Sequence, residues 1–186
     1  MPNWCDNTVE IYHKDPAMIE RVRKGFNEGG LLNEFFPCPA ELHEHTAPEQ
    51  DEARAKRFVE QYGASDWYNW QVQNWGTKWD VGGDGYEAQD IPNGLLLTFE
   101  SAWSPPTGAY EKLVEQGFEI RAMYYEPGMA FAGIWDNGND DYYEYGGMNS
   151  TQIAEELPEV LDEAFGISES VAEWKAENEE DENEEE

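Results

Sequence analysis

The sequence has little positive charge. It holds 11 Lys and Arg against 41 Asp and Glu, which gives a formal net charge of −30 at pH 7. Residues 169–186 carry ten carboxylates and one lysine, or −9, so −21 remains on residues 1–168. Because nucleic-acid binding depends on Lys and Arg displacing counterions from phosphates, this composition disfavours direct DNA or RNA binding. It favours a partner protein that is itself basic, and solubility alone is the other interpretation of the charge.

Long apolar runs are also missing. No segment approaches the roughly 20 residues that a membrane helix needs. The first residues lack the basic start and apolar stretch of a signal peptide. We therefore expect a cytoplasmic protein without a membrane partner. Cysteine is scarce too, and in that compartment Cys5 and Cys38 are expected to be reduced rather than bridged.

No catalytic motif stands out, and the candidate metal ligands are few. Cys38, His43 and His45, with Cys5 as a further candidate, have side chains that suit Zn²⁺. Structural zinc sites usually show paired, closely spaced ligands, whereas here one cysteine precedes two histidines. An acidic neighbourhood also stabilises a protonated thiol, which disfavours cysteine catalysis. We expect no enzyme activity and no cofactor or metal.

Aromatic residues, by contrast, are abundant: 8 Trp, 10 Tyr and 8 Phe. They concentrate in Asn74-Trp75-Gly76-Thr77-Lys78-Trp79-Asp80, a segment matched further on by Ala102-Trp103-Ser104-Pro105-Pro106. Large aromatics bury well and bring an N–H that needs a partner. We predict a structural hub in which Trp75, Trp79 and Trp103 are core residues and Lys78 pairs with Asp80. The alternative is that Trp75, Lys78, Trp79 and Trp103 form a pocket for a small ligand or nucleotide.

Hydrophobic periodicity predicts the secondary structure. Alternation or turn signals indicate strands at residues 8–12, within 78–89, and at 95–103, 118–124, 129–135 and 142–145. In the strand at 95–103, we expect Leu95, Leu97, Phe99 and Trp103 on one face. Helical spacing or capping residues indicate helices after Asp15-Pro16, within 41–63, at 66–74, after a Ser104 cap, and from Ser150 with a break at Pro158. Residues 31–39 are predicted to form a crossing loop and 136–141 a hairpin tip.

This order predicts an α+β fold with a ferredoxin-like split β-α-β antiparallel sheet and helices on one face. Residues 1–147 would form the ferredoxin-like domain, with a helical insertion at about 41–74. Residues 148–168 would form a C-terminal helix packed on the domain. Residues 169–186 would form an acidic tail, disordered or a frayed helix, because blocks of like charge repel one another.

Five short motifs in order resemble a known family. They are Met1-Pro2-Asn3-Trp4-Cys5, Phe36-Pro37-Cys38-Pro39, the two Trp-containing segments above, and Tyr125-Glu126-Pro127-Gly128. Together they resemble the YubB-type ferredoxin-like domain of phage and plasmid proteins over roughly residues 1–135. The resemblance implies a ferredoxin-like fold and an origin on a mobile element. It implies no settled activity.

The acidic residues suggest a mechanism. Negative charge at regular spacing over one surface would imitate the phosphates of a duplex, which fall about 1.7 Å apart along the axis of B-DNA. We therefore expect a non-enzymatic accessory protein of a phage or plasmid, in the bacterial cytoplasm, that inhibits a host nuclease or other defence protein through its basic surface. The expected partner-binding residues are Asp84, Glu87, Asp90, Asp136, Asp140, Asp141 and Glu144, together with the tail.

Overall fold

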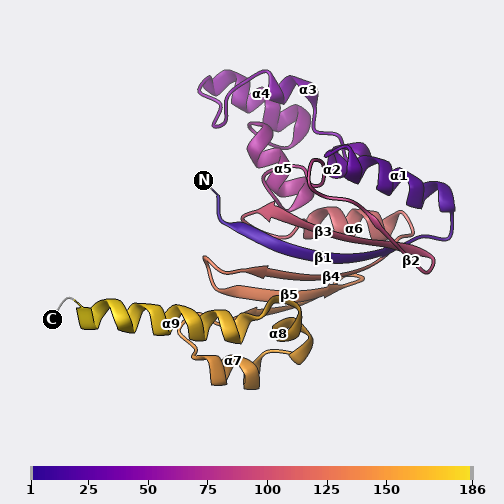
Figure 1. Cartoon of the computed structure of the whole chain (residues 1–186). Coiled ribbons are helices and arrows are strands. Elements are labelled where there is room, and N and C mark those ends of the chain that lie inside the picture. Colours follow the sequence, from indigo (N-terminus) through magenta and orange to yellow (C-terminus); the bar gives the residue numbers. More distant parts are fainter. Residues whose placement is uncertain (1, 185–186) are drawn as a thin grey trace.

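A six-stranded antiparallel sheet is the centre of the fold (Figure 1). The computed structural model describes the backbone of residues 2–184 and the side chains of residues 2–176. The strand order is β2-β3-β1-β4-β5-β6. The strands are β1 (Trp4–Tyr12), β2 (Gln89–Ile91), β3 (Gly94–Ala102), β4 (Glu119–Glu126), β5 (Phe131–Asp136) and β6 (Asn139–Glu144).

The first four of these strands confirm the predicted split β-α-β arrangement. Helix α1 (Pro16–Asn27) follows β1, helix α6 (Thr107–Glu115) follows β3, and β1 lies between β3 and β4. Both helices lie on one face of the sheet (Figure 1). As predicted, Asp15 caps α1, where its carboxylate accepts a hydrogen bond from the amide of Ala17. Strands β5 and β6 extend the sheet at the β4 edge.

Alternation along the strands creates the main core. On β1 every second residue is buried, including Val9 and Ile11, because successive side chains of a strand point to opposite faces. On β3 the predicted Leu95, Leu97 and Phe99 are buried on the same side as these residues, against Phe26 of α1. The fourth residue predicted for this face, Trp103, lies beyond the end of β3 and is exposed, so that part of the prediction is wrong.

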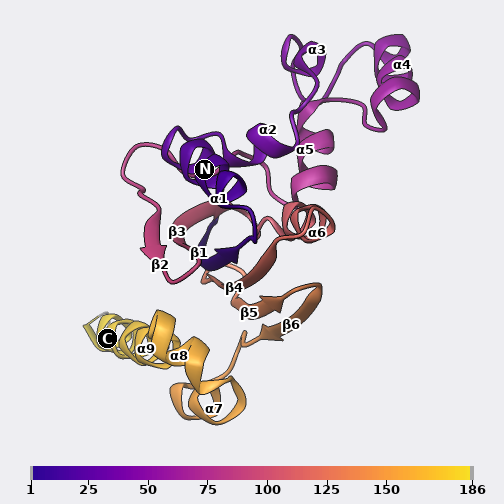
Figure 2. The same ribbon diagram turned by 90° about the vertical axis from the view of Figure 1, so that its right-hand side faces the viewer.

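The helical insertion lies between β1 and β2 in the sequence. It contains α2 (Leu31–Phe35), α3 (Ala40–His43), α4 (Glu52–Tyr62) and α5 (Trp67–Trp75). Figure 2 shows α3 and α4 projecting away from the sheet, connected to it through α5. The predicted crossing loop at 31–39 is wrong in its first half, because residues 31–35 form α2, where the amides of Leu32 and Asn33 donate hydrogen bonds to the Asp80 carboxylate.

Three further helices cover part of the opposite face (Figure 1). They are α7 (Ser150–Glu156), α8 (Glu159–Phe165) and α9 (Ile167–Glu184). Their apolar side chains form a second core with β4 and β5, made of Tyr125, Ala132, Tyr145, Ile153, Leu157, Leu161 and Ile167. The predicted break at Pro158 separates α7 from α8, and Asn149 rather than Ser150 caps α7. Residues 169–184 of the segment predicted as a disordered tail or a frayed helix are helical, and residues 185–186 lie outside the described part of the chain.

Glycines account for a missing strand. Residues 78–88 contain no strand, contrary to the prediction. Gly82, Gly83 and Gly85 all have positive φ, a conformation that favours glycine and interrupts a regular strand. The Gly82 backbone lies against α1, where a Cβ on Gly82 would be 2.1 Å from the carbonyl oxygen of Phe26. The strand therefore begins only at Gln89.

Two turn predictions also need correction. Ser104 does not cap α6, because Pro106 occupies the cap position and the Ser104 hydroxyl donates to the carbonyl of Gly76. The predicted six-residue hairpin tip is shorter than expected. Asn137 and Gly138, both at positive φ, make the turn, and β6 already begins at Asn139.

Candidate functional site

The Trp-containing segments form a hub, as predicted. The Thr77 hydroxyl donates a 2.8 Å hydrogen bond to the carbonyl of Ala102, and the Ser104 hydroxyl donates a 2.5 Å hydrogen bond to that of Gly76. A Cβ on Gly76 would lie 3.0 Å from the amide nitrogen of Gly108, so only glycine allows α5 and α6 to approach so closely. The hub therefore holds the end of β3 and the start of α6 against α5.

The three tryptophans of the hub have different environments. Trp75 is 1% exposed and its indole N–H donates to the carbonyl of Phe36 at 2.9 Å. Trp79 and Trp103, predicted as core, are 38% and 44% exposed. Trp103 follows β3 with φ +75°, a backbone conformation that L side chains rarely adopt. This turn ends the strand alternation and directs the indole away from the core.

Lys78 and Asp80 do not form the predicted ion pair. The Lys78 ammonium lies 4.6 Å from the ring centroid of Trp79 and 5.8 Å from that of Tyr68, which are cation–π distances. Asp80 instead binds the amides of Leu32 and Asn33 at 2.7 and 2.9 Å. Burial raises the pKa of Asp80, although these amide hydrogen bonds oppose the shift. Asp80 therefore has a structural role.

Exposed aromatic rings surround Lys78. We call Trp4, Tyr68, Trp79 and Trp103 the aromatic surface. The rings of Trp4 and Trp79 are 5.8 Å apart. A pocket of about 410 Å³ opens beside Lys78, lined also by Ala47, Pro48, Asp66, Trp67, Tyr68, Asn69 and Trp103. Of the pocket predicted from the sequence, Lys78 and Trp103 line this cavity, Trp79 lies next to it and Trp75 is buried elsewhere.

Trp4 and Tyr68 were missed in the sequence analysis. Trp4 is the direct partner of Ala102 across β1 and β3, which places it beside Trp103. Tyr68 belongs to the first turn of α5, for which the sequence predicted a helix at 66–74 and no exposed side chain.

The seven predicted partner-binding carboxylates do not form one surface. Asp84 and Glu87 precede β2 and Asp90 lies on it, at one edge of the sheet. The other four, Asp136, Asp140, Asp141 and Glu144, belong to β5 and β6 at the opposite edge. Asp90 is also paired with Arg23 at 2.5 Å. The strand order therefore divides the predicted set into two groups.

The second group belongs to a much larger acidic region. Residues 122–186 contain 20 carboxylates and one basic residue, Lys175, whereas residues 1–121 contain 21 carboxylates and ten basic residues. The net charges are −19 and −11. We define the acidic surface as the exposed carboxylates from the end of β5 to α9, namely Asp136, Asp140, Asp141, Glu144, Glu155, Glu156, Glu159, Glu163, Glu169 and Glu173.

Ion pairing increases this contrast. In the described part of the chain, the carboxylates within 4 Å of a basic side chain all lie between Glu20 and Asp90. Examples are Glu34 with Arg21 and Glu41 with Arg57. Within residues 2–176, no carboxylate of the acidic surface has such a pair. Its charge therefore remains available to a basic partner.

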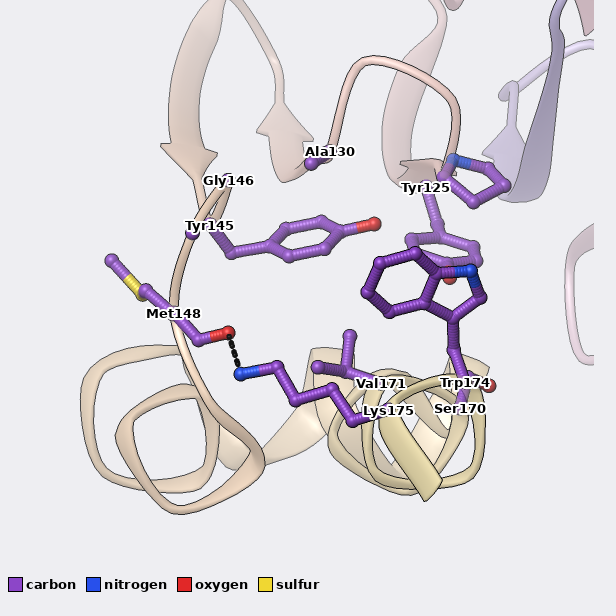
Figure 3. A pocket seen from close by; sticks show the side chains of 11 residues that line it. Tyr125, Ala130, Tyr145, Gly146, Met148, Ser170, Val171, Trp174 and Lys175 are labelled. Atoms are coloured by element: carbon purple, nitrogen blue, oxygen red, sulfur yellow. Dashed lines mark hydrogen bonds between the residues drawn. The ribbon is translucent and has the colours of Figure 1, made fainter. Parts of the chain in front are cut away.

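A second pocket, of about 550 Å³, lies between α9 and the sheet (Figure 3). Its walls are aromatic and apolar, with Tyr125, Tyr145 and Trp174 as the large rings. Figure 3 shows these rings together with Val171 and Lys175 of α9. The Lys175 ammonium donates to the carbonyl of Met148 at 3.4 Å. No part of this pocket was predicted.

The cysteines and histidines show no arrangement for catalysis. Cys5 and Cys38 are free and buried. Burial raises the pKa of Cys5 to about 12 and that of Cys38 to about 11, so both are protonated thiols at neutral pH. His43 stacks on Trp67 and His45 lies 3.0 Å from Arg54. Among the described residues, no three His, Cys, Asp or Glu side chains are close enough to share a metal ion.

The helices within residues 2–184 also include none with the length and apolarity required to cross a membrane.

Comparison with known proteins gives little further information. No protein-family model and no curated protein matches the chain. Among solved structures, the chain is similar to the crystal structure of protein api92 from Yersinia pseudotuberculosis, of the family DUF1281. The TM-score is 0.43 and the identity 15%, over 79% of this chain and 99% of that chain.

Proposed function

We propose that this protein is a non-enzymatic accessory protein of a phage or plasmid that binds a basic host protein through its acidic surface. The partner would be a nuclease or another defence protein of the bacterial cytoplasm, inhibited because the acidic surface occupies its nucleic-acid site. One observation carries the proposal: 20 carboxylates against a single lysine in residues 122–186, with no ion pair on the described acidic surface.

The charge density of α9 supports mimicry of a nucleic acid. The 18 residues of this helix include eight carboxylates, and at 1.5 Å per residue the helix is about 27 Å long. Averaged over the helix, one carboxylate falls about every 3.4 Å, close to the spacing of phosphates along one DNA strand. Figure 1 shows α9 extending past the end of the sheet, where a large partner has access to it.

The position of the acidic surface explains how such a protein remains folded. Like charges on a compact domain destabilise it by mutual repulsion. Here six of the ten carboxylates belong to a helical layer, α7 to α9, whose inner side, with Ile153, Leu161 and Ile167, is anchored on the sheet by apolar packing. Hydrophobic burial of this kind does not depend on the net charge. The helical layer can therefore stay folded with the high density of negative charge that a basic cleft would bind.

A capture experiment tests the proposal. The protein is immobilised, exposed to nuclease-treated bacterial lysate at low and high salt, and then washed with duplex DNA. We expect a basic protein to be retained at low salt, lost at high salt and displaced by the duplex, because both ligands would occupy one site. Retention of a protein that duplex DNA does not displace would contradict mimicry. Absence of any retained basic protein would contradict the proposal as a whole.

A second function has its own supporting observation. Lys78 has no carboxylate within ion-pair distance in the described residues, although the chain has 41 acidic residues. Its pocket also presents the rings of Tyr68 and Trp103. A small planar anion such as a nucleotide would stack on a ring and place its charge on the ammonium.

Thermal shifts distinguish this second function from the first. If the pocket binds nucleotides, AMP should raise the melting temperature of the wild type and not of Lys78→Met, which keeps the side-chain stem but removes its charge. Lys56→Met on α4 removes an equal charge from an exposed site and serves as the control. No shift with AMP, combined with retention of a basic protein, would leave only the first function.

A further inference from the structure

The pocket between α9 and the sheet has the features of a receptor for a cationic side chain. Tyr125 comes from β4, Tyr145 follows β6 and Trp174 belongs to α9. The rings of Tyr125 and Tyr145 are 6.1 Å apart and inclined by 22°. Tyr125 also stacks on Phe165 at 5.5 Å. Packing therefore fixes the rings of Tyr125 and Tyr145. Trp174, at 63% exposed, forms the outer wall of the pocket.

The buried carboxylate of Glu126 lies close enough to Tyr125 and Tyr145 to act on both hydroxyls. Glu126 is 1% exposed, and its carboxylate accepts hydrogen bonds from the amides of Gly128 and Met129 at 2.9 and 2.6 Å. No basic side chain of the described residues lies within 4 Å of it. Burial raises the pKa of Tyr125 and Tyr145. The hydrogen bond between the two hydroxyls lowers the pKa of Tyr125 and raises that of Tyr145, and the charge of Glu126 makes a smaller contribution that raises both. The pocket therefore combines aromatic walls with carboxylates nearby, namely Glu126 behind its lining and Glu169 and Glu173 on α9, while Lys175 is the cation of the lining itself.

We infer that this pocket receives an arginine side chain of the basic partner. The inference rests on the proposed function, since it assigns the anchor point of that same acidic surface. The guanidinium group is planar and weakly hydrated and stacks on aromatic faces, whereas the lysine ammonium is strongly hydrated. The Tyr125 and Tyr145 hydroxyl oxygens can accept its N–H donors. The volume of about 550 Å³ is sufficient for such a side chain.

The charge of Lys175 makes it possible to test whether the occupant of the pocket is a cation or an anion. It is the one basic residue after Arg121, and its ammonium donates to Met148 at the pocket wall. If the occupant is a cation, Lys175 repels it, so removal of the lysine charge strengthens binding. If the occupant were an anion, Lys175 would attract it and its removal would weaken binding. The two occupants therefore predict opposite effects of Lys175→Gln.

Two peptides of equal charge test the inference. Acetylated and amidated hexaarginine and hexalysine are titrated into the full-length protein at low ionic strength, with heat as the readout. We expect hexaarginine to bind roughly 3- to 10-fold more tightly, the range of one or two cation–π contacts. Trp174→Leu should remove most of this preference, whereas Tyr142→Leu, which removes an exposed ring outside the pocket, should retain it. Lys175→Gln should strengthen hexaarginine binding more than Lys24→Gln, an equal charge change on α1.

The outcomes separate the inference from the function on which it rests. Equal binding of both peptides that is unchanged by Trp174→Leu would overturn the arginine pocket and leave the acidic surface intact. Weaker hexaarginine binding by Lys175→Gln than by Lys24→Gln would overturn the pocket as well. If neither peptide bound at low salt, the proposed function itself would fail.

Discussion

Asp6 on β1 lies directly opposite Glu100 on β3, so two carboxylates face each other across neighbouring strands. Burial raises the pKa of Asp6, and the charge of Glu100 raises it further. A raised pKa means that the folded protein binds this proton more tightly than the unfolded chain does. The stabilisation from the proton is complete below the ordinary Asp pKa of about 4 and is lost as the pH rises through the folded-state pKa.

Asp6→Asn should therefore stabilise the protein at pH 7. The expected gain in the free energy of unfolding is a few tenths of a kcal/mol. Cross-strand charge pairs change stability by about 0.2–1 kcal/mol, with like charges destabilising, and solvent screens a partly exposed pair. Urea denaturation at several pH values measures the effect, which should shrink towards pH 4. Asp84→Asn in the exposed glycine loop is the control. A loss of stability on Asp6→Asn at pH 7 would show that the carboxylate is favourably bound.

Gly82→Ala should destabilise the protein strongly. Gly82 and Gly85 have nearly the same φ, +94° and +93°, but a Cβ on Gly82 would meet the Phe26 carbonyl oxygen at 2.1 Å, and one on Gly85 would meet nothing within 4 Å. Gly85→Ala should cost about 1–2 kcal/mol for the left-handed conformation alone. Gly82→Ala should cost at least about 2 kcal/mol more. Similar losses in both variants, measured by denaturant unfolding, would contradict the close approach to α1.

Asp80→Ala should lower the free energy of unfolding by about 1–3 kcal/mol, because it leaves the amides of Leu32 and Asn33 without their acceptor. Lys78→Met should change stability by less than about 1 kcal/mol, because it removes only the cation–π contacts. Chemical denaturation of both variants makes the comparison. Equal destabilisation by both variants, together with a double variant no less stable than either, would support the ion pair between Lys78 and Asp80 predicted from the sequence.

Trp75→Ala and Trp103→Ala compare a core tryptophan with a surface one. Loss of the buried Trp75 side chain should cost about 3–5 kcal/mol. Trp103→Ala should cost less than about 1 kcal/mol, because the indole is 44% exposed. A large loss on Trp103→Ala would mean that its ring is needed for folding, and it would weaken the interpretation of the aromatic surface as a binding site.

The sequence is sufficient to predict elements with a clear period or cap. Leu95, Leu97 and Phe99 alternate, and the structure buries all three in β3. Asp15 caps α1 as predicted, and Pro158 separates two helices. The fold class follows from these elements, because the split β-α-β order admits few arrangements.

The features that the sequence analysis did not predict depend on contacts between residues far apart in the chain. The separation of Asp90 from Asp140 depends on the strand order, which puts β2 and β6 at opposite edges. Asp80 has a lysine two residues away, yet its partners are amides 47 and 48 residues earlier. The pocket of Tyr125, Tyr145 and Trp174 exists only after α9 packs on the sheet. Local patterns contain no signal for any of these.

Two variants with the same net charge test the central claim most directly. One replaces six carboxylates of the acidic surface by amides: Asp141, Glu144, Glu155, Glu156, Glu163 and Glu173. The other replaces six exposed carboxylates elsewhere: Glu28, Glu44, Glu60, Glu111, Glu115 and Glu119. The quantity to measure is the affinity of each variant for the captured basic protein as a function of salt concentration. We predict a large loss of affinity and a shallower salt dependence for the first variant only; equal losses in both would show that net charge, and not the acidic surface, governs binding.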